Sequence, residues 1–177
     1  METYFNPEQI ALAKKSFAEA DMITRRFFGI NAKEKKLHRY DVKTRAFLAK
    51  HEINGDTFAH LLKYEFNRTH GNDENEGAPI LFYRICLQDD VILNAVERAD
   101  NFVRLAPLLL YVATHELVHV VRFERGESDF YATGQEKRNE EEKVHRLTRN
   151  LLKPFADTDM NLVLECFSDQ YRMYPFQ

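Results

Sequence analysis

The sequence has no tryptophan, and it contains only two cysteines, six glycines and five prolines among 177 residues. Cys86 and Cys166 both stand in apolar surroundings, which favours reduced core thiols over a disulfide. They are also too few for a zinc–thiolate cluster. The chain has no internal repeat and no low-complexity segment. Its composition, 44% hydrophobic and 30% charged, is that of an ordinary globular protein.

Long apolar runs and a strong charge imbalance are also missing. The longest apolar stretch, Leu105–Ala113, is too short to span a bilayer and is interrupted by Pro107. The formal net charge of −3 is too close to neutral to indicate binding of nucleic acid or of an anionic membrane surface. The first residues have neither the basic nor the apolar region of a secretion signal. We therefore expect one compact cytoplasmic domain, which fits the length.

Helical spacing and capping residues predict three helices in the N-terminal third. Asn6-Pro7 is typical of a helix start, and that helix runs to Gly29. Asn31 begins a second helix that reaches residue 53, and Asp56 begins a third that reaches residue 66. The histidines of these helices lack the pairing of metal ligands.

The pattern changes after a polar loop at residues 71–77. Ile80–Leu87 is rich in strand-forming residues and predicts a β-strand, followed by a turn at Asp89-Asp90. Val91–Val96 fits either a second strand or the start of a short helix. Three further helices are expected, from residue 100 or 101 to Gly126, from 135 to 153, and from a cap at residue 157 or 158. An aromatic tail covers residues 171–176.

The central motif is His115-Glu116-Leu117-Val118-His119, in an apolar segment without a helix breaker. On a helix, His115 and His119 stand one turn apart on the same face, where two imidazoles can bind one zinc ion. Glu116 is then placed to act as a general base on water at the metal. The alternative is a buried helix whose histidines are satisfied by core hydrogen bonds. Burying three such side chains together without a partner would be expensive.

A catalytic zinc site needs a third protein ligand, and the residues after His119 lack the Gly-x-x-His continuation of metzincins. Candidates cluster at residues 139–147. With Val144 on the inward face of that helix, Glu141 is the first choice and Glu142 the second. His145 fits either as a ligand or as a group that hydrogen-bonds a ligand. Glu140 and Glu142 are expected only to complement the helix dipole.

These two segments resemble those of the gluzincins, the HExxH metallopeptidases whose third ligand is a glutamate on a later helix. Residues 141–145 are similar to their Glu-x-x-Ala-Asp/Asn signature, with Val144 for alanine and His145 for the acidic or amide residue. The continuation to Pro154 resembles the ImmA/IrrE-type peptidases, and the resemblance covers roughly residues 80–154.

The resemblance implies an α+β fold, a mostly helical zincin-like domain with a small antiparallel or mixed sheet next to the active-site helix. Three parts are expected within this single domain of residues 1–177: a helical N-terminal part (1–70), a metal-site core (78–154) and a C-terminal helix and tail (155–177). In such a fold an edge strand receives an extended peptide, and Ile80–Leu87 is the segment expected in that role.

The implied function is a Zn²⁺-dependent metallopeptidase acting on a peptide or protein substrate. Zinc on His115, His119 and Glu141 would activate water, with Glu116 as general base. Tyr131, His145 and Tyr171 are candidate oxyanion donors. The rival hypothesis is a catalytically silent zincin-like binding or regulatory module that acts through protein partners. An intact Glu116 favours the enzyme, because a scaffold needs no general base.

Overall fold

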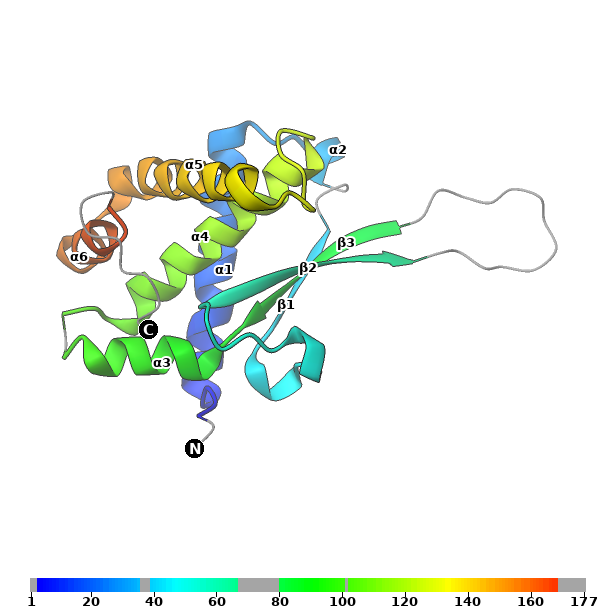
Figure 1. Cartoon of the computed structure of the whole chain (residues 1–177). Helices are drawn as coiled ribbons and strands as arrows, with labels where there is room; N and C mark the ends of the chain where they lie inside the picture. The colour runs from blue at the N-terminus through cyan, green and yellow to red at the C-terminus, as the bar shows by residue number, and fades with distance from the viewer. Residues whose placement is uncertain (1–2, 36–38, 67–79, 101, 169–177) are drawn as a thin grey trace, which may run out of the picture.

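The computed structural model describes residues 3–35, 39–66, 80–100 and 102–168. In these ranges the chain is α+β, with helices packed around one long apolar helix and a three-stranded mixed sheet beside it (Figure 1). The expected fold class, helices with a small mixed sheet, is confirmed at this level. Within the described ranges, no helix combines the length and the apolarity that crossing a membrane requires.

The long apolar helix is α4 (Leu105–Glu124), and every side chain from residue 111 to residue 122 is buried. It starts later than expected, at Leu105, with Pro107 in its first turn, where a missing N–H is tolerated. It ends at Glu124, and Gly126, two residues further on, has a φ of 66°, which allows the Glu127 N–H to bond the Arg122 carbonyl at 2.9 Å. Because α4 is apolar on nearly every face, the other elements pack around it.

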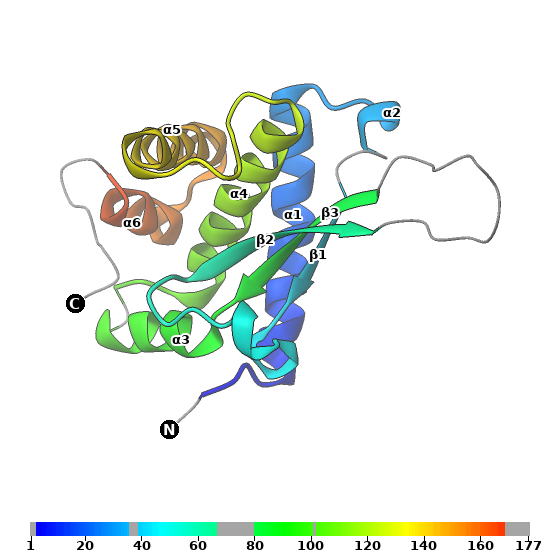
Figure 2. The same cartoon turned by 45° about the vertical axis from the view of Figure 1, so that its right-hand side comes forward.

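Three helices cover α4, as the two cartoon views show (Figures 1 and 2). The first, α1 (Pro7–Phe28), begins with the expected Asn6 cap, which accepts a hydrogen bond from the Gln9 N–H at 2.9 Å. Its buried stripe lies along α4. The others are α5 (Gly134–Leu152) and α6 (Thr158–Cys166), which confirm the two predicted C-terminal helices. Asp157 caps α6 through the Met160 N–H, as expected.

The sheet has the strand order β1–β3–β2. The central strand β3 (Ile80–Leu87) has the bounds that the sequence predicts. It pairs in parallel with β1 (Tyr40–Lys43) and antiparallel with β2 (Ala59–Phe66). The cysteines Cys86 and Cys166 are free and buried, as expected.

The prediction of a helical N-terminal part is wrong after residue 35. The second helix is one turn, α2 (Ala32–Lys35), although Asn31 does cap it. The third predicted helix is the strand β2. Its apolar residues can be placed at helical spacing, but Tyr64 and Phe66 stack on Phe82 of β3, with ring centroids 5.2 and 5.3 Å apart. Cross-strand aromatic stacking of this kind stabilises a sheet, and it depends on a partner distant in sequence.

The predicted turn at Asp89-Asp90 is instead the first turn of α3 (Asp89–Arg98), so the helical alternative for Val91–Val96 is correct. Asp89 is fully buried, and its carboxylate accepts hydrogen bonds from the Phe5 N–H at 2.9 Å and the Arg45 N–H at 3.0 Å. The Asp89 side chain therefore connects α3 both to the N-terminus, at Phe5, and to the segment that follows β1, at Arg45. The predicted loop at 71–77 and the tail at 171–176 lie outside the described residues.

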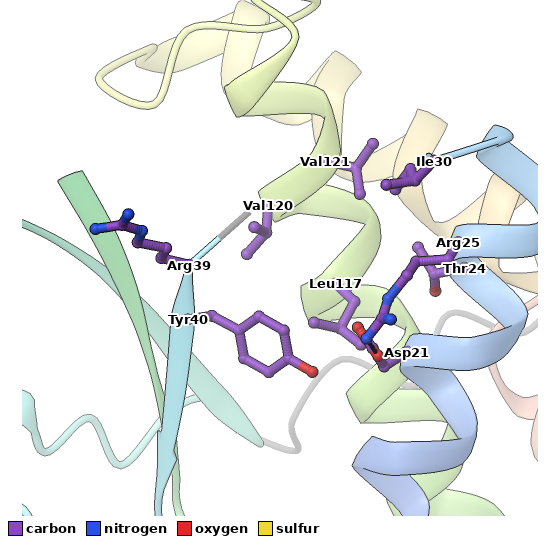
Figure 3. Close-up of a pocket in the computed structure, with 9 residues that line it drawn as sticks. All are labelled: Asp21, Thr24, Arg25, Ile30, Arg39, Tyr40, Leu117, Val120 and Val121. Atoms are coloured by element: carbon purple, nitrogen blue, oxygen red, sulfur yellow. Dashed lines mark ion pairs between the residues drawn. The ribbon is translucent and has the colours of Figure 1, made fainter. Parts of the chain in front are cut away.

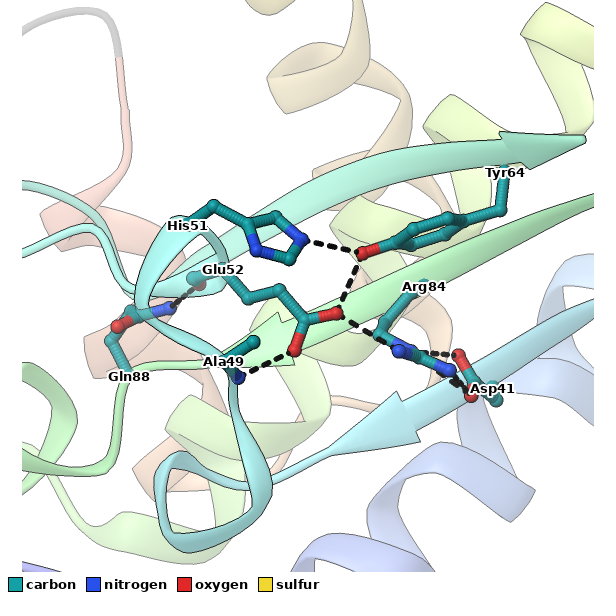
Figure 4. A network of polar contacts seen from close by, with 7 residues as sticks. All are labelled: Asp41, Ala49, His51, Glu52, Tyr64, Arg84 and Gln88. Carbon is teal, nitrogen blue, oxygen red and sulfur yellow. Dashed lines mark hydrogen bonds and ion pairs between the residues drawn. The ribbon is translucent and has the colours of Figure 1, made fainter.

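A polar network holds the segment between β1 and β2 against the sheet (Figure 4). Glu52 is 1% exposed and accepts hydrogen bonds from the Ala49 N–H at 2.8 Å, the Tyr64 hydroxyl at 2.7 Å and Arg84 at 2.9 Å. Arg84 also pairs with Asp41 on β1. Each strand of the sheet thus contributes one member, which explains how a short, irregular segment is fixed in one position.

Candidate metal centre

The HExxH motif lies in the buried middle of α4, as the sequence predicts. His115 is 9% exposed, Glu116 8% and His119 5%. The two imidazole rings stand one turn apart with centroids separated by 4.8 Å. Because the helix is fixed by packing on several sides, both rings are presented from a rigid element.

Glu141 of α5 faces both histidines with its two carboxylate oxygens. Oε2 lies 3.4 Å from Nε2 of His115, and Oε1 lies 3.5 Å from Nε2 of His119. Ligands held about 2.05 Å from a tetrahedral zinc ion are about 3.4 Å from one another. Each carboxylate oxygen therefore lies at the spacing of neighbouring ligands from one histidine nitrogen, and Glu141, the first choice from the sequence, is the carboxylate that faces both rings.

The two nitrogens of each ring have different surroundings. Nδ1 of His115 and Nδ1 of His119 are buried and have no hydrogen-bond partner among the described residues. Histidine ligands of zinc bind through one nitrogen and donate a hydrogen bond from the other. The Nε2 atoms face Glu141, so the chemistry and the direction of the donor set fit a zinc ion.

Charge at this point follows from the same contacts. Burial acts to raise the pKa of Glu141, but hydrogen bonds and positive charge from His115 and His119 outweigh it and lower that pKa far below its ordinary value. Burial acts to lower the pKa of His119, but Glu141 outweighs it and the pKa is raised. The pKa of Glu116 is raised, mainly by burial. The centre therefore stabilises positive charge beside the Glu141 carboxylate.

Glu140 has a larger role than the predicted dipole effect. It is 8% exposed and forms a bidentate ion pair with Arg122 of α4, with Oε1 2.7 Å from Nε and Oε2 2.8 Å from Nη2. The sequence contained a signal for this burial, because Glu140, Val144 and Thr148 stand four residues apart on one stripe of α5. Glu142, by contrast, is exposed.

His145 lies beside the three predicted ligands. Its ring centroid is 4.4 Å from that of His115, and the potential ligand atoms of His115, Glu141 and His145 lie within 4.8 Å of one another. Its Nδ1 is 2.7 Å from the hydroxyl of Tyr111, a buried residue of α4 that the sequence did not single out. Burial, with the charge of His115, lowers the pKa of His145 to about 3, so the ring is neutral at pH 7.

The loop after α4 has an aromatic surface next to the centre. The ring of His119 stacks on Phe123 at 5.4 Å, and Phe130 contacts both Phe123 and Tyr83 of β3. Tyr131 follows, 68% exposed, with its ring against Phe130. The contacts of Tyr131 are therefore with the aromatic surface, and its predicted role as an oxyanion donor stays a prediction. Tyr171 lies outside the described residues.

The predicted position of Ile80–Leu87 at a sheet edge is wrong for residues 83–86. This strand, β3, pairs with β2 along its whole length and with β1 at residues 83–86, so the backbone groups of that stretch are taken up in the sheet. The antiparallel edge strand is β2, which also contacts α4. Lys63 of β2 lies over the ring of Tyr131, 5.9 Å from its centroid. The edge of β2 and the loop after α4 are therefore neighbours.

A separate cavity lies behind α4, between α1 and β1 (Figure 3). It has a volume of about 320 Å³, and α4 contributes Leu117, Val120 and Val121 to its wall. At 100° per residue these side chains point away from His115 and His119. This cavity therefore belongs to the opposite face of the helix.

The chain matches no protein-family model, and neither a curated protein nor a solved structure matches it.

Proposed function

We propose that this protein is a zinc-dependent peptidase of the gluzincin type, with His115, His119 and Glu141 as the zinc ligands. The observation that carries the proposal is the position of the Glu141 carboxylate, 3.4 and 3.5 Å from the Nε2 atoms of the HExxH histidines. Residues from two helices, 22 or more positions apart in sequence, thus converge with the spacing of neighbouring zinc ligands. When bound there, zinc supplies Lewis-acid polarisation of a carbonyl and lowers the pKa of water.

The protein's own groups support the remaining steps of peptide hydrolysis. Glu116 follows the first ligand on α4 and is buried beside the centre, where a carboxylate can accept a proton from the attacking water and donate it to the leaving amine. The edge strand β2 is suited to bind an extended peptide by strand addition. The substrate backbone would then lie between β2 and the loop that carries Tyr131.

The role of His145, a candidate oxyanion donor, depends on which of its ring nitrogens carries the proton. A neutral imidazole has one N–H. If the Tyr111 hydroxyl donates to Nδ1, Nε2 carries the proton and can donate to the developing oxyanion. If Nδ1 donates to Tyr111, Nε2 is a lone-pair donor and fits a fourth metal ligand.

A second candidate function follows from that last arrangement. With His145 as a fourth ligand, the zinc site is closed, as in structural sites, and the protein is a zinc-dependent binding or regulatory module. Catalytic zinc sites keep one position open for water or substrate. The two functions therefore differ in whether purified zinc-loaded protein cleaves peptides.

The test combines zinc analysis with cleavage of a peptide library by the wild type and by Glu116→Gln. We expect both proteins to hold one equivalent of zinc, and the variant to lose cleavage by a factor of about 10²–10⁴, typical of a missing general base. Glu142→Gln, an exposed glutamate of α5, is the matched control and should keep activity. Undiminished cleavage by Glu116→Gln would show that the base is misassigned. A zinc-loaded wild type that cleaves no peptide would favour the binding module.

A further inference from the structure

Three charged side chains, two of them buried and one exposed, form a cluster directly next to the candidate metal centre. Arg122 of α4 is 2% exposed and contacts two carboxylates, Glu140 of α5 and Glu127 of the loop after α4. Nη1 of Arg122 is 2.6 Å from Oε2 of Glu127. The guanidinium therefore connects the loop to the first turns of α5.

One oxygen of this cluster also faces a ligand of the metal centre. Oε1 of Glu140, which accepts from Arg122 at 2.7 Å, is 3.8 Å from Nδ1 of His119. That Nδ1 is buried and has no hydrogen-bond partner among the described residues. Hydrogen bonds around catalytic centres are often long before the ligand binds and shorten in the loaded state. Glu140 is therefore the acceptor placed to receive the Nδ1–H of His119.

The tautomer of His119 matters because its Nε2 faces Glu141. A proton on Nδ1 leaves the lone pair on Nε2, on the side of the other two proposed ligands. Carboxylates that hold a zinc-binding histidine in this way fix the ring and make the nitrogen a better donor. A buried ion pair alone is weak evidence for a role in stability, since apolar side chains of similar size are often equally stable.

We propose that Glu140 is a positioning residue for His119, and that Arg122 holds Glu140 in place while connecting it to the loop after α4. This inference rests on the proposed function, because it requires His119 to be a zinc ligand. The chain of contacts runs from Glu127 in the loop through Arg122 and Glu140 to His119. A shift of the loop that carries Phe130 and Tyr131 would thus change the position of one proposed zinc ligand, His119.

The experiment measures zinc affinity, by competition with a chelator, in the double variant Arg122→Met/Glu140→Leu. Replacing the whole pair by apolar residues avoids leaving one buried charge unpaired, so the protein should stay folded. We expect zinc affinity to fall by a factor of about 10–100, the usual effect of losing such a partner of a histidine ligand. The matched control is Arg146→Met/Glu142→Leu, an exposed arginine and glutamate on α5, which should bind zinc like the wild type.

A second measurement reads the hydrogen bond of the His119 ring directly. In zinc-loaded protein, where Nε2 binds the metal and Nδ1 carries the proton, ¹H–¹⁵N NMR spectra should show this proton further downfield in the wild type than in Glu140→Gln, because a carboxylate is the stronger acceptor. A merely structural ion pair would not change this signature. Wild-type zinc affinity in the folded double variant, or an unchanged chemical shift of the His119 Nδ1 proton in zinc-loaded Glu140→Gln, would overturn the inference. Failure of the proposed function is distinguishable, since the wild type itself would then bind no zinc, or would bind zinc with the expected dependence on Glu140 and cleave no peptide.

Discussion

Glu52 allows a prediction whose size follows from the structure. Its carboxylate is buried, and burial acts to raise its pKa. Hydrogen bonds from the Ala49 N–H, the Tyr64 hydroxyl and Arg84 outweigh burial and lower the pKa from 4.5 to about 2. A pKa that is lower in the folded state means that the ionised carboxylate stabilises the fold, because the pKa returns to its ordinary value when the protein unfolds.

The stabilisation can be estimated from this shift. A difference of about 2.5 pKa units corresponds to about 3 kcal/mol at neutral pH, at 1.36 kcal/mol per unit. The contribution is complete above pH 4.5 and is lost as pH falls toward 2. It should be about 1.5 kcal/mol at pH 3. Glutamine has the shape of a protonated glutamate, so Glu52→Gln should remove the same pH-dependent contribution.

The assay is urea unfolding of the wild type and of Glu52→Gln between pH 7 and pH 3. We expect the difference in free energy of unfolding to be about 3 kcal/mol at pH 7 and to halve by pH 3. Glu65→Gln, an exposed glutamate of the same sheet, is the control and should give less than about 0.5 kcal/mol. A difference for Glu52→Gln that stays constant with pH would refute the reasoning, because the effect would then not come from ionisation.

Two further predictions concern the core and the metal. Leu109 of α4 has no exposed surface, so Leu109→Ala should lower the free energy of unfolding by about 2–5 kcal/mol. The control is Phe47→Ala, at a position 67% exposed, which should change it by less than about 0.5 kcal/mol. Equal effects would show that α4 is not the centre of the core. Zinc at a hundredfold excess over its dissociation constant should stabilise the wild type by about 2.7 kcal/mol in thermal unfolding, and His119→Ala should lose most of this gain; an equal gain in the variant would place the metal elsewhere.

The sequence was sufficient where local pattern decides structure. The strand Ile80–Leu87 and the helices after residue 104 follow from composition, spacing and breakers within a few residues of each element. The sequence failed for β2, which has a helix-like spacing of apolar residues and becomes a strand through Tyr64, Phe66 and their stacking on Phe82. It also failed to place β3 in the middle of the sheet. Pairing between distant segments is not visible in a local pattern.

In the candidate centre, too, a local motif predicts some residues, whereas the packing of distant segments decides the others. His115, Glu116 and His119 are one continuous motif, and the helical repeat alone puts both histidines on one face. The position of Glu141, the proposed third ligand, depends on how α5 packs against α4. Spacing within α5 indicates which of its faces is buried, but it does not show which part of α4 that face contacts.

The three consecutive glutamates of α5 show what this packing decides. Successive residues of a helix are rotated by 100°, so Glu140, Glu141 and Glu142 face three directions although their side chains are chemically identical. Glu140 lies on the buried stripe with Val144 and pairs with Arg122. Glu141 is rotated from it by 100°, has a side chain that is 42% exposed, and contacts both histidines. Glu142 faces solvent. A rotation of α5 by one residue would exchange these roles. The buried stripe that stabilises the core is therefore also what sets the Glu141 carboxylate opposite His115 and His119, and a change in the packing of Val144 should alter metal binding before it unfolds the protein.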